Sequence, residues 1–150
     1  KKDLQSILNA KKTFKSLIFK YPDTDFATDA MFKINLIDEI LAAKEMYLGR
    51  YYLDRKKWIS AINRFRVVVD DYETTIYVEE ATHRLVEIYY RLGIETEAKK
   101  YANLLGYNYQ SSEWYEKSYS VFNKNYKKNK TKDIKKENNS ILKKFKSLFS

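Results

Sequence analysis

The chain of 150 residues has 44% hydrophobic residues, one Pro, three Gly and no Cys. This composition is too hydrophobic for a chain that is disordered throughout, and so few Pro and Gly favour long helices. The absence of Cys excludes disulfides, thiolate metal sites and a cysteine nucleophile, and no apolar run reaches the ~20 residues of a membrane-spanning helix. The polar start, KKDLQSILNA, is not a signal peptide, so we expect any targeting segment to lie upstream.

The net charge of +9 is concentrated near the C-terminus. Residues 1–122 carry 19 Lys and Arg against 18 Asp and Glu, whereas residues 123–150 carry 10 Lys against two acidic residues. A nucleic-acid-binding domain more often has a basic face on its folded body. We therefore expect a nearly neutral folded body with no nucleic-acid partner, followed by a basic tail.

The chain opens with the apolar spacing of a helix over residues 3–20. Ala10 and Phe14 match the second helix of a tetratricopeptide repeat (TPR), and Pro22 follows at the expected distance. Proline disfavours helical geometry in the residue before it, so the helix ends there. Residues 1–22 are therefore interpreted as the second half of a repeat.

The next segment predicts one unusually long helix over residues 25–54, with Asp23 or Thr24 as its N-cap. It contains no Pro, and its only Gly is Gly49. A helix of about 30 residues is roughly 45 Å long, enough to brace two neighbouring repeats. A break near residues 42–43 is the alternative.

Residues 45–73 match a complete TPR hairpin, and this match organises the rest of the prediction. Its consensus residues are Leu48, Gly49, Tyr52, Ala61 and Phe65. A polar turn over 55–57 leads into a helix over 58–72, so that the repeat spans 25–73. The residues that we expect to face inward on this last helix are Ile59, Ile62, Phe65, Val68 and Val69.

A weaker copy follows over residues 76–110. It contains two expected helices, each ended by a glycine: 78–92 before Gly93, and 95–105 before Gly106. Ala61 and Ala98 are 37 residues apart, close to the repeat period of about 34. With a terminal helix over 112–122, the pattern predicts an all-α, TPR-like solenoid with a right-handed superhelical twist.

A solenoid of this kind has a concave groove, lined by first-helix residues that face away from the second helix. The predicted protein-binding residues are Met46, Arg50, Asp54, His83, Glu87, Tyr90 and Arg91. The alternative for each of them is ordinary solvated helix surface.

The sequence offers little for catalysis. His83 is the only His, which leaves no second His for a catalytic or metal set. Asp23, Asp25 and Asp29 resemble the start of a calcium loop. Ile34 stands where that loop needs a glutamate, and helix capping explains the aspartates better. We therefore expect a noncatalytic protein without a metal or cofactor.

The tail divides into a Lys-rich flexible linker over 123–139 and a short basic amphipathic helix over 140–150. The residues that give the helix its two faces include Lys143, Lys144, Phe145, Lys146 and Phe149. Such a helix suits an anionic membrane surface. Docking in a partner's groove, folding back on the solenoid, and a solvated tail remain alternatives.

Four stretches together resemble the BamD (ComL) family of outer membrane assembly lipoproteins, in its alphaproteobacterial form. The stretches are FKYPDTDFATDA (19–30), EMYLGRYYLDRKKWISAINRFRVVVDDYETT (45–75), EEATHRLVEIYYRLGIETEAKKYANLLGYNY (79–109) and SEWYEKSY (112–119). The resemblance covers about residues 1–120. The family usually has Pro after the last Tyr of the third stretch, where this chain has Gln110.

The resemblance implies a five-repeat scaffold, lipid-anchored at the periplasmic face of the outer membrane, of which this chain is the C-terminal half. Its partners would be the periplasmic POTRA domains of BamA, accessory lipoproteins and, mainly through the leading repeats, unfolded outer membrane proteins. Arg91 falls where the family makes a polar contact with BamA. The alternative function is a generic TPR adaptor that binds a peptide or protein tail in its groove.

Overall fold

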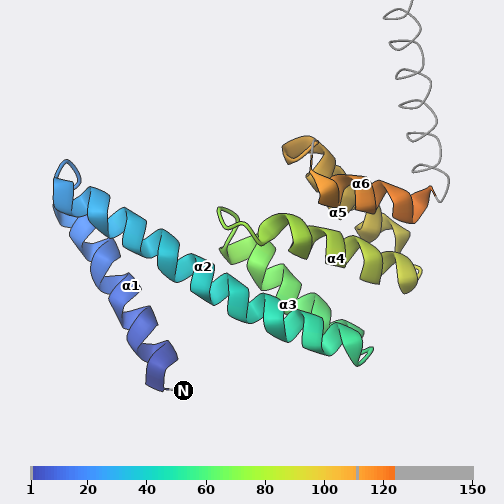
Figure 1. Cartoon of the computed structure of the whole chain (residues 1–150), viewed down its shortest axis with the longest axis horizontal. Coiled ribbons are helices and arrows are strands. Elements are labelled where there is room, and N and C mark those ends of the chain that lie inside the picture. The colour runs from blue at the N-terminus through green and yellow to red at the C-terminus, as the bar shows by residue number, and fades with distance from the viewer. Residues whose placement is uncertain (1, 111, 124–150) are drawn as a thin grey trace, which may run out of the picture.

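The computed structural model describes residues 2–110 and 112–123, and every regular element within them is a helix (Figure 1). The elements are α1 (Lys2–Lys20), α2 (Asp25–Asp54), α3 (Trp58–Asp71), α4 (Val78–Arg91), α5 (Glu95–Asn108) and α6 (Glu113–Phe122). The prediction of an all-α, TPR-like fold is therefore confirmed. None of the described helices combines the length and the apolar character needed to cross a membrane.

The long helix α2 runs without a break and links the two ends of the molecule. Thr24 caps it, because its Oγ1 accepts a hydrogen bond from the Ala27 N–H at 3.2 Å. Figure 1 shows α1 folding back along the first part of α2, and α3 folding back along its second part. An ion pair between Lys11 and Asp38 joins α1 to α2. The alternative break near residues 42–43 does not occur.

The two successive hairpins, α2–α3 and α4–α5, repeat with a period of 37 residues. Lys56 and Gly93 are 37 positions apart, and both have positive φ, 56° and 76° respectively. Each turn is closed by the same backbone hydrogen bond between residues five positions apart. Lys57 N–H donates to Tyr52 O, and Ile94 N–H donates to Tyr89 O, both at 2.9 Å. This is the Schellman arrangement at a helix C-terminus. The 37-residue spacing of Ala61 and Ala98 therefore also appears in the backbone conformation of the two turns.

The core lies where α2, α3 and α4 meet. Its buried members from these helices and α5 are Ala42, Met46, Ala61, Ile62, Phe65, Val68, Ala81, Leu85, Val86, Ile88 and Tyr101. A Cβ added to Gly49 would lie only 2.6 Å from Phe65 Cε1, so the absence of a side chain lets α3 approach α2 closely. Apolar burial between neighbouring helices therefore holds the hairpins together.

Two predicted details are wrong. Ile59 was expected to face inward but is 68% exposed, because the first turn of α3 directs Trp58 rather than Ile59 toward the neighbouring helices. Gly106 does not end α5, which continues to Asn108. At Gly106 a Cβ would come within 3.1 Å of Tyr115, so this glycine provides room for α6 inside a continuing helix.

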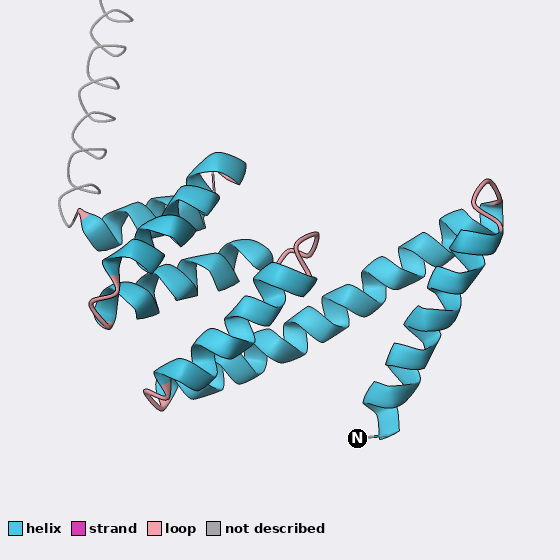
Figure 2. Ribbon diagram, turned by 180° about the vertical axis from the view of Figure 1, so that it is seen from behind, coloured by secondary structure: helices cyan, strands magenta, loops and turns pink. Residues whose placement is uncertain are grey.

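The terminal helix α6 packs more on α4 than on α5. Figure 2 shows these three helices grouped at the end of the molecule opposite α1. Ser112 caps it, with its Oγ accepting a hydrogen bond from the Tyr115 N–H at 3.1 Å. On the inner side, Ser118 is buried and lies 2.8 Å from His83 Nδ1 of α4. The position of α6 is thus set by a polar contact in the core as well as by apolar packing.

Candidate protein-docking surface

A polar pocket of about 290 Å³ lies where α2 ends, α3 begins and α4 passes beside them. Its lining residues are Leu53, Asp54, Lys56, Trp58, Arg84, Glu87, Ile88 and Arg91. Three predicted groove residues, Asp54, Glu87 and Arg91, therefore lie around one pocket. Asp54 and Arg91 are the last residues of α2 and α4, 37 positions apart, so the repeat brings an acid and a base to the same rim.

Arg91 is placed by an aromatic neighbour that the sequence did not identify as part of the site. Its guanidinium carbon lies 5.3 Å from the centroid of the Trp58 ring, a cation–π distance. Trp58 is half-buried and Arg91 is exposed. Because Trp and Arg are the residue types most enriched where protein partners gain their affinity, we expect this pair to be the central feature of the surface.

Arg50 does not line the pocket, and its guanidinium forms an ion pair with Glu80 of the same chain. Its Nε lies 3.0 Å from Glu80 Oε1 and its second terminal nitrogen lies 2.5 Å from Glu80 Oε2, so that a bidentate bond links α2 to α4. Burial acts to raise the pKa of Glu80, but the hydrogen bond from Arg50 and the charges of Arg50 and Arg84 outweigh it and lower this pKa. The hydrogen bond to Glu80 likewise raises the pKa of Arg50.

The charge network continues along α4 toward α6. Arg84 donates to Glu87 Oε2 at 2.7 Å, and its Nε lies 3.5 Å from Glu80 Oε1. Glu87 Oε2 is also 3.6 Å from Nε2 of His83. The rim residue Glu87 is therefore held in place by its own helix, which orients it before any partner arrives.

Replacing Glu80 by Gln is expected to lower the free energy of unfolding at pH 7 by about 1–2 kcal/mol, because it removes the charge from a bidentate, partly buried hydrogen bond. Urea denaturation would measure the loss. Glu79→Gln is the matched control, since it removes the same charge from the same first turn of α4. Equal losses in the two variants would show that the contact with Arg50 contributes nothing.

Met46 and His83 were predicted to line the groove, and the structure contradicts that placement. Met46 is 0% exposed and His83 is 3% exposed. Both occupy the equivalent position of their repeats, 37 residues apart, on the side of the first helix that packs against neighbouring helices. Tyr90 is half-exposed, but its ring meets Phe122 of α6 edge to face at 5.2 Å, and it does not line the pocket.

His83 is a core histidine rather than a ligand. Burial, as the main cause, lowers its pKa from the ordinary 6.5 to about 4 despite the opposing charge of Glu87. Its imidazole is therefore neutral at pH 7. Among residues 2–110 and 112–123, no group of three or more His, Asp or Glu side chains is arranged to hold a metal ion.

The remaining predicted site residues belong to the tail and lie outside the described residues. These are Lys143, Lys144, Phe145, Lys146 and Phe149. The linker expected over 123–139 is also outside them, apart from Asn123.

Comparison with known proteins supports the resemblance seen in the sequence. The family model YfiO, described as an outer membrane lipoprotein, matches residues 1–105. The outer membrane protein assembly factor BamD of Rickettsia prowazekii is 49% identical over 117 residues, which cover 78% of this chain and 46% of that protein. BamD of Caulobacter vibrioides is 38% identical over 124 residues, or 83% of this chain and 41% of that protein.

These matches run through the helices that build the docking surface, since the model match alone extends from α1 into α5. The chain spans somewhat less than half the length of the two relatives. With the helical repeats, this similarity shows that the chain belongs to the YfiO/BamD family of outer membrane lipoproteins.

Proposed function

We propose that this chain is a noncatalytic scaffold subunit of the β-barrel outer membrane protein assembly complex and that it docks the periplasmic POTRA domains of BamA. The observation that carries the proposal is family membership, together with the relatives' shared name as assembly factors. Because the chain spans less than half of those proteins, this role is inferred for the part in hand.

The pocket beside Trp58 supports docking of a folded partner more than capture of a buried small molecule. Its volume of about 290 Å³ is small, and its rim combines Asp54, Glu87 and Arg91 with an aromatic floor. A partner carboxylate could pair with Arg91 while an apolar side chain covers Trp58. Such a charged pair fixes the register of an interface, and the desolvated aromatic supplies affinity.

The same family role would place the protein at the periplasmic face of the outer membrane, tethered by a lipid anchor carried outside this chain. Accessory lipoproteins would bind the same half of the protein as BamA, the half that this chain represents. Unfolded outer membrane proteins would contact mainly the repeats that precede it in the longer relatives. These partners extend the proposal, and binding of each to this chain can be measured by isothermal titration calorimetry.

Arg91→Glu is expected to weaken binding of the 150-residue chain to the BamA POTRA domains by more than 1 kcal/mol, at least about fivefold in Kd. Charge reversal would replace attraction to a partner carboxylate by repulsion and would remove the contact with Trp58. Isothermal titration calorimetry would measure both affinities. Arg66→Glu is the matched control, because Arg66 lies exposed on α3 and away from the pocket.

Two outcomes would count against this assignment. Equal affinities for Arg91→Glu and the unmodified chain would remove Arg91 from the interface while leaving the partner intact. No measurable association between a folded, helical chain and the POTRA domains would contradict BamA docking itself. Circular dichroism on each sample separates the second outcome from a failure to fold.

A further inference from the structure

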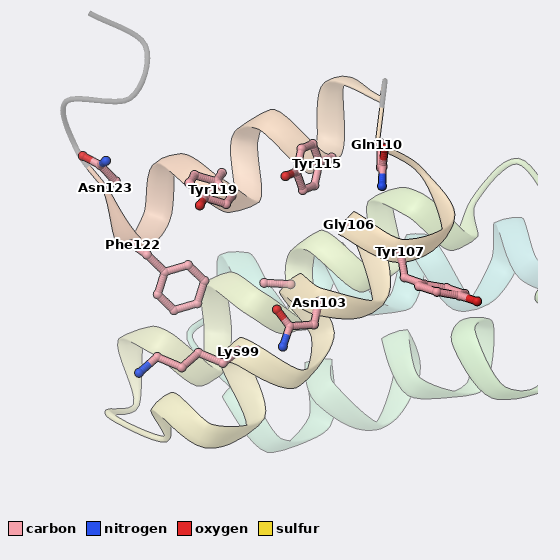
Figure 3. Close-up of a pocket in the computed structure, with 10 residues that line it drawn as sticks. Lys99, Asn103, Gly106, Tyr107, Gln110, Tyr115, Tyr119, Phe122 and Asn123 are labelled. Atoms are coloured by element: carbon pink, nitrogen blue, oxygen red, sulfur yellow. The ribbon is translucent and has the colours of Figure 1, made fainter. Parts of the chain in front are cut away.

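A second and larger groove lies between α5 and α6. It has a volume of about 660 Å³ and is lined by Lys99, Ala102, Asn103, Gly106, Tyr107, Gln110, Tyr115, Tyr119, Phe122 and Asn123. Figure 3 shows Phe122 extending from the end of α6 toward α5, with Lys99 and Asn103 extending from α5. Tyr107, on its margin, is 87% exposed. The lining thus combines aromatic and small residues with four polar side chains, those of Lys99, Asn103, Gln110 and Asn123.

The groove exists because α5 has small residues where α3 has large ones. The period of 37 residues aligns Ala102 with Phe65 and Gly106 with Val69. Phe65 is fully buried in the joint that α3 makes with its neighbours. At the equivalent joint, α6 has moved onto α4, and α5 leaves a hollow that another element can fill with its own side chains.

We propose that residues 140–150 of the same chain dock in this groove as a short helix and close the end of the solenoid. Helical spacing places their apolar residues within about a third of the helix circumference: Ile141, Leu142, Phe145, Leu148 and Phe149. Eleven helical residues extend about 16 Å, against about 15 Å for the ten residues of α6 that form one wall. The segment therefore matches the groove in both chemistry and length.

The position of the segment in the chain favours it over a separate partner. The predicted linker begins at Asn123, which itself lines the groove, and residues 124–139 then lead to the segment. A tether of sixteen residues that behaved as a random coil would have a root-mean-square span of about 22 Å and would give an effective concentration of about millimolar. A second copy of the chain would have to compete with that local concentration.

Docking would also solve a problem common to all solenoids, whose last repeat exposes an apolar face unless a polar cap covers it. With Phe145 and Phe149 inserted beside Ala102 and Gly106, Lys143 and Lys146 would point toward solvent. The segment has too few residues to form a stable helix alone in water. The groove would therefore supply the contacts that make it helical.

Paramagnetic relaxation enhancement in the full 150-residue chain tests the docking directly. The chain has no Cys, so Ser147→Cys carries a nitroxide at one defined position on the polar side of the segment. We expect strong broadening of the amide signals of Asn103, Gly106 and Tyr119, and none for α1. Phe145→Ser with Phe149→Ser keeps the same tether, and should reduce that broadening to the level of an undocked tail.

Lys143→Ser with Lys146→Ser is the matched control, because it changes two positions of the polar face and should leave the broadening unchanged. Tyr107→Ser, at an exposed groove position, should weaken docking without disturbing the core. If the variant with both Phe145→Ser and Phe149→Ser showed the same broadening as the chain with the unmodified tail, the proposal would be overturned. So would broadening that appears only between a labelled and an isotope-enriched copy, since a second chain would then occupy the groove.

Discussion

Phe65→Ala is expected to lower the free energy of unfolding by about 3–5 kcal/mol, the range for removing a fully buried aromatic side chain. Phe65 is 0% exposed and belongs to the cluster that joins α2, α3 and α4. Removing the ring would leave a cavity inside this cluster, next to Gly49, which has no side chain to fill it. Urea denaturation followed by circular dichroism would measure the loss, with an unchanged m-value showing that the two-state transition is retained.

The contact between Phe65 and Gly49 makes this prediction sharper. In the unmodified chain, Gly49→Ala is expected to cost about 1–3 kcal/mol, because the new Cβ would meet Phe65 Cε1 at 2.6 Å inside a packed core. In the Phe65→Ala background the obstruction is gone. There the same substitution should be neutral or stabilise the protein by up to about 1 kcal/mol, since Ala favours helix over Gly.

The control is Gly106→Ala, whose Cβ would meet the partly exposed Tyr115 at 3.1 Å and so has a neighbour that can shift. We expect a change within about 0.5 kcal/mol there. If Gly49→Ala has the same effect with and without the Phe65 ring, the close approach is not what Gly49 provides. The double-mutant cycle isolates that one pairwise contact.

Elements with local chemical markers could be predicted from the sequence. α2 begins after the Thr24 cap and ends at Asp54, as expected, because a cap and a turn fix both ends. α4 ends one residue before its predicted limit, where Gly93 takes a positive φ. The end of α5 could not be predicted, since Gly106 faces Tyr115 of α6 and only the tertiary structure shows that this glycine is a packing position.

The docking surface was predicted only in part, for a related physical reason. A first helix in a solenoid packs against its own hairpin partner and also against the next repeat, so apolar periodicity does not distinguish its two buried sides. Met46 and His83 lie on such a side and were assigned to the groove. Charged residues at helix ends were easier to assign to the surface. Asp54 and Arg91 are the last residues of α2 and α4, so both lie next to a turn. Trp58 was missed because its role depends on Arg91 from another repeat.

The stability of the protein is expected to fall by about 2 kcal/mol between pH 7.5 and pH 5, and His83 is the cause. Its folded-state pKa is lowered to about 4, below the ordinary 6.5 of an unfolded chain. The unfolded state therefore binds a proton first as the pH falls, and stability declines from about pH 6.5 until it levels off near pH 4. The lowered pKa of Glu80 acts only below the ordinary carboxyl range near 4.5, so its contribution is lost at lower pH.

His83→Asn should remove this decline, because Asn can hydrogen-bond to Ser118 without titrating between pH 5 and 7.5. The measurement is the slope of unfolding free energy against pH, which does not depend on the absolute stability of the variant. As His83 is the only histidine, its ring signal in proton NMR also reports its pKa directly. A flat profile for the unmodified chain, or the same slope in His83→Asn, would contradict the assignment.

The acid sensitivity should appear first at α6. His83 contacts Ser118 at 2.8 Å and its ring lies 5.3 Å from that of Trp114, so two residues of α6 pack directly on the buried imidazole. Protonation would place a positive charge near Arg84 and Lys117, which already lower the His83 pKa, while Glu87 opposes them. Hydrogen-exchange protection factors, which correct for the slower intrinsic exchange at low pH, should therefore fall in α6 at pH 5 before they fall in α2 and α3. In His83→Asn the protection factors should keep their pH 7.5 order.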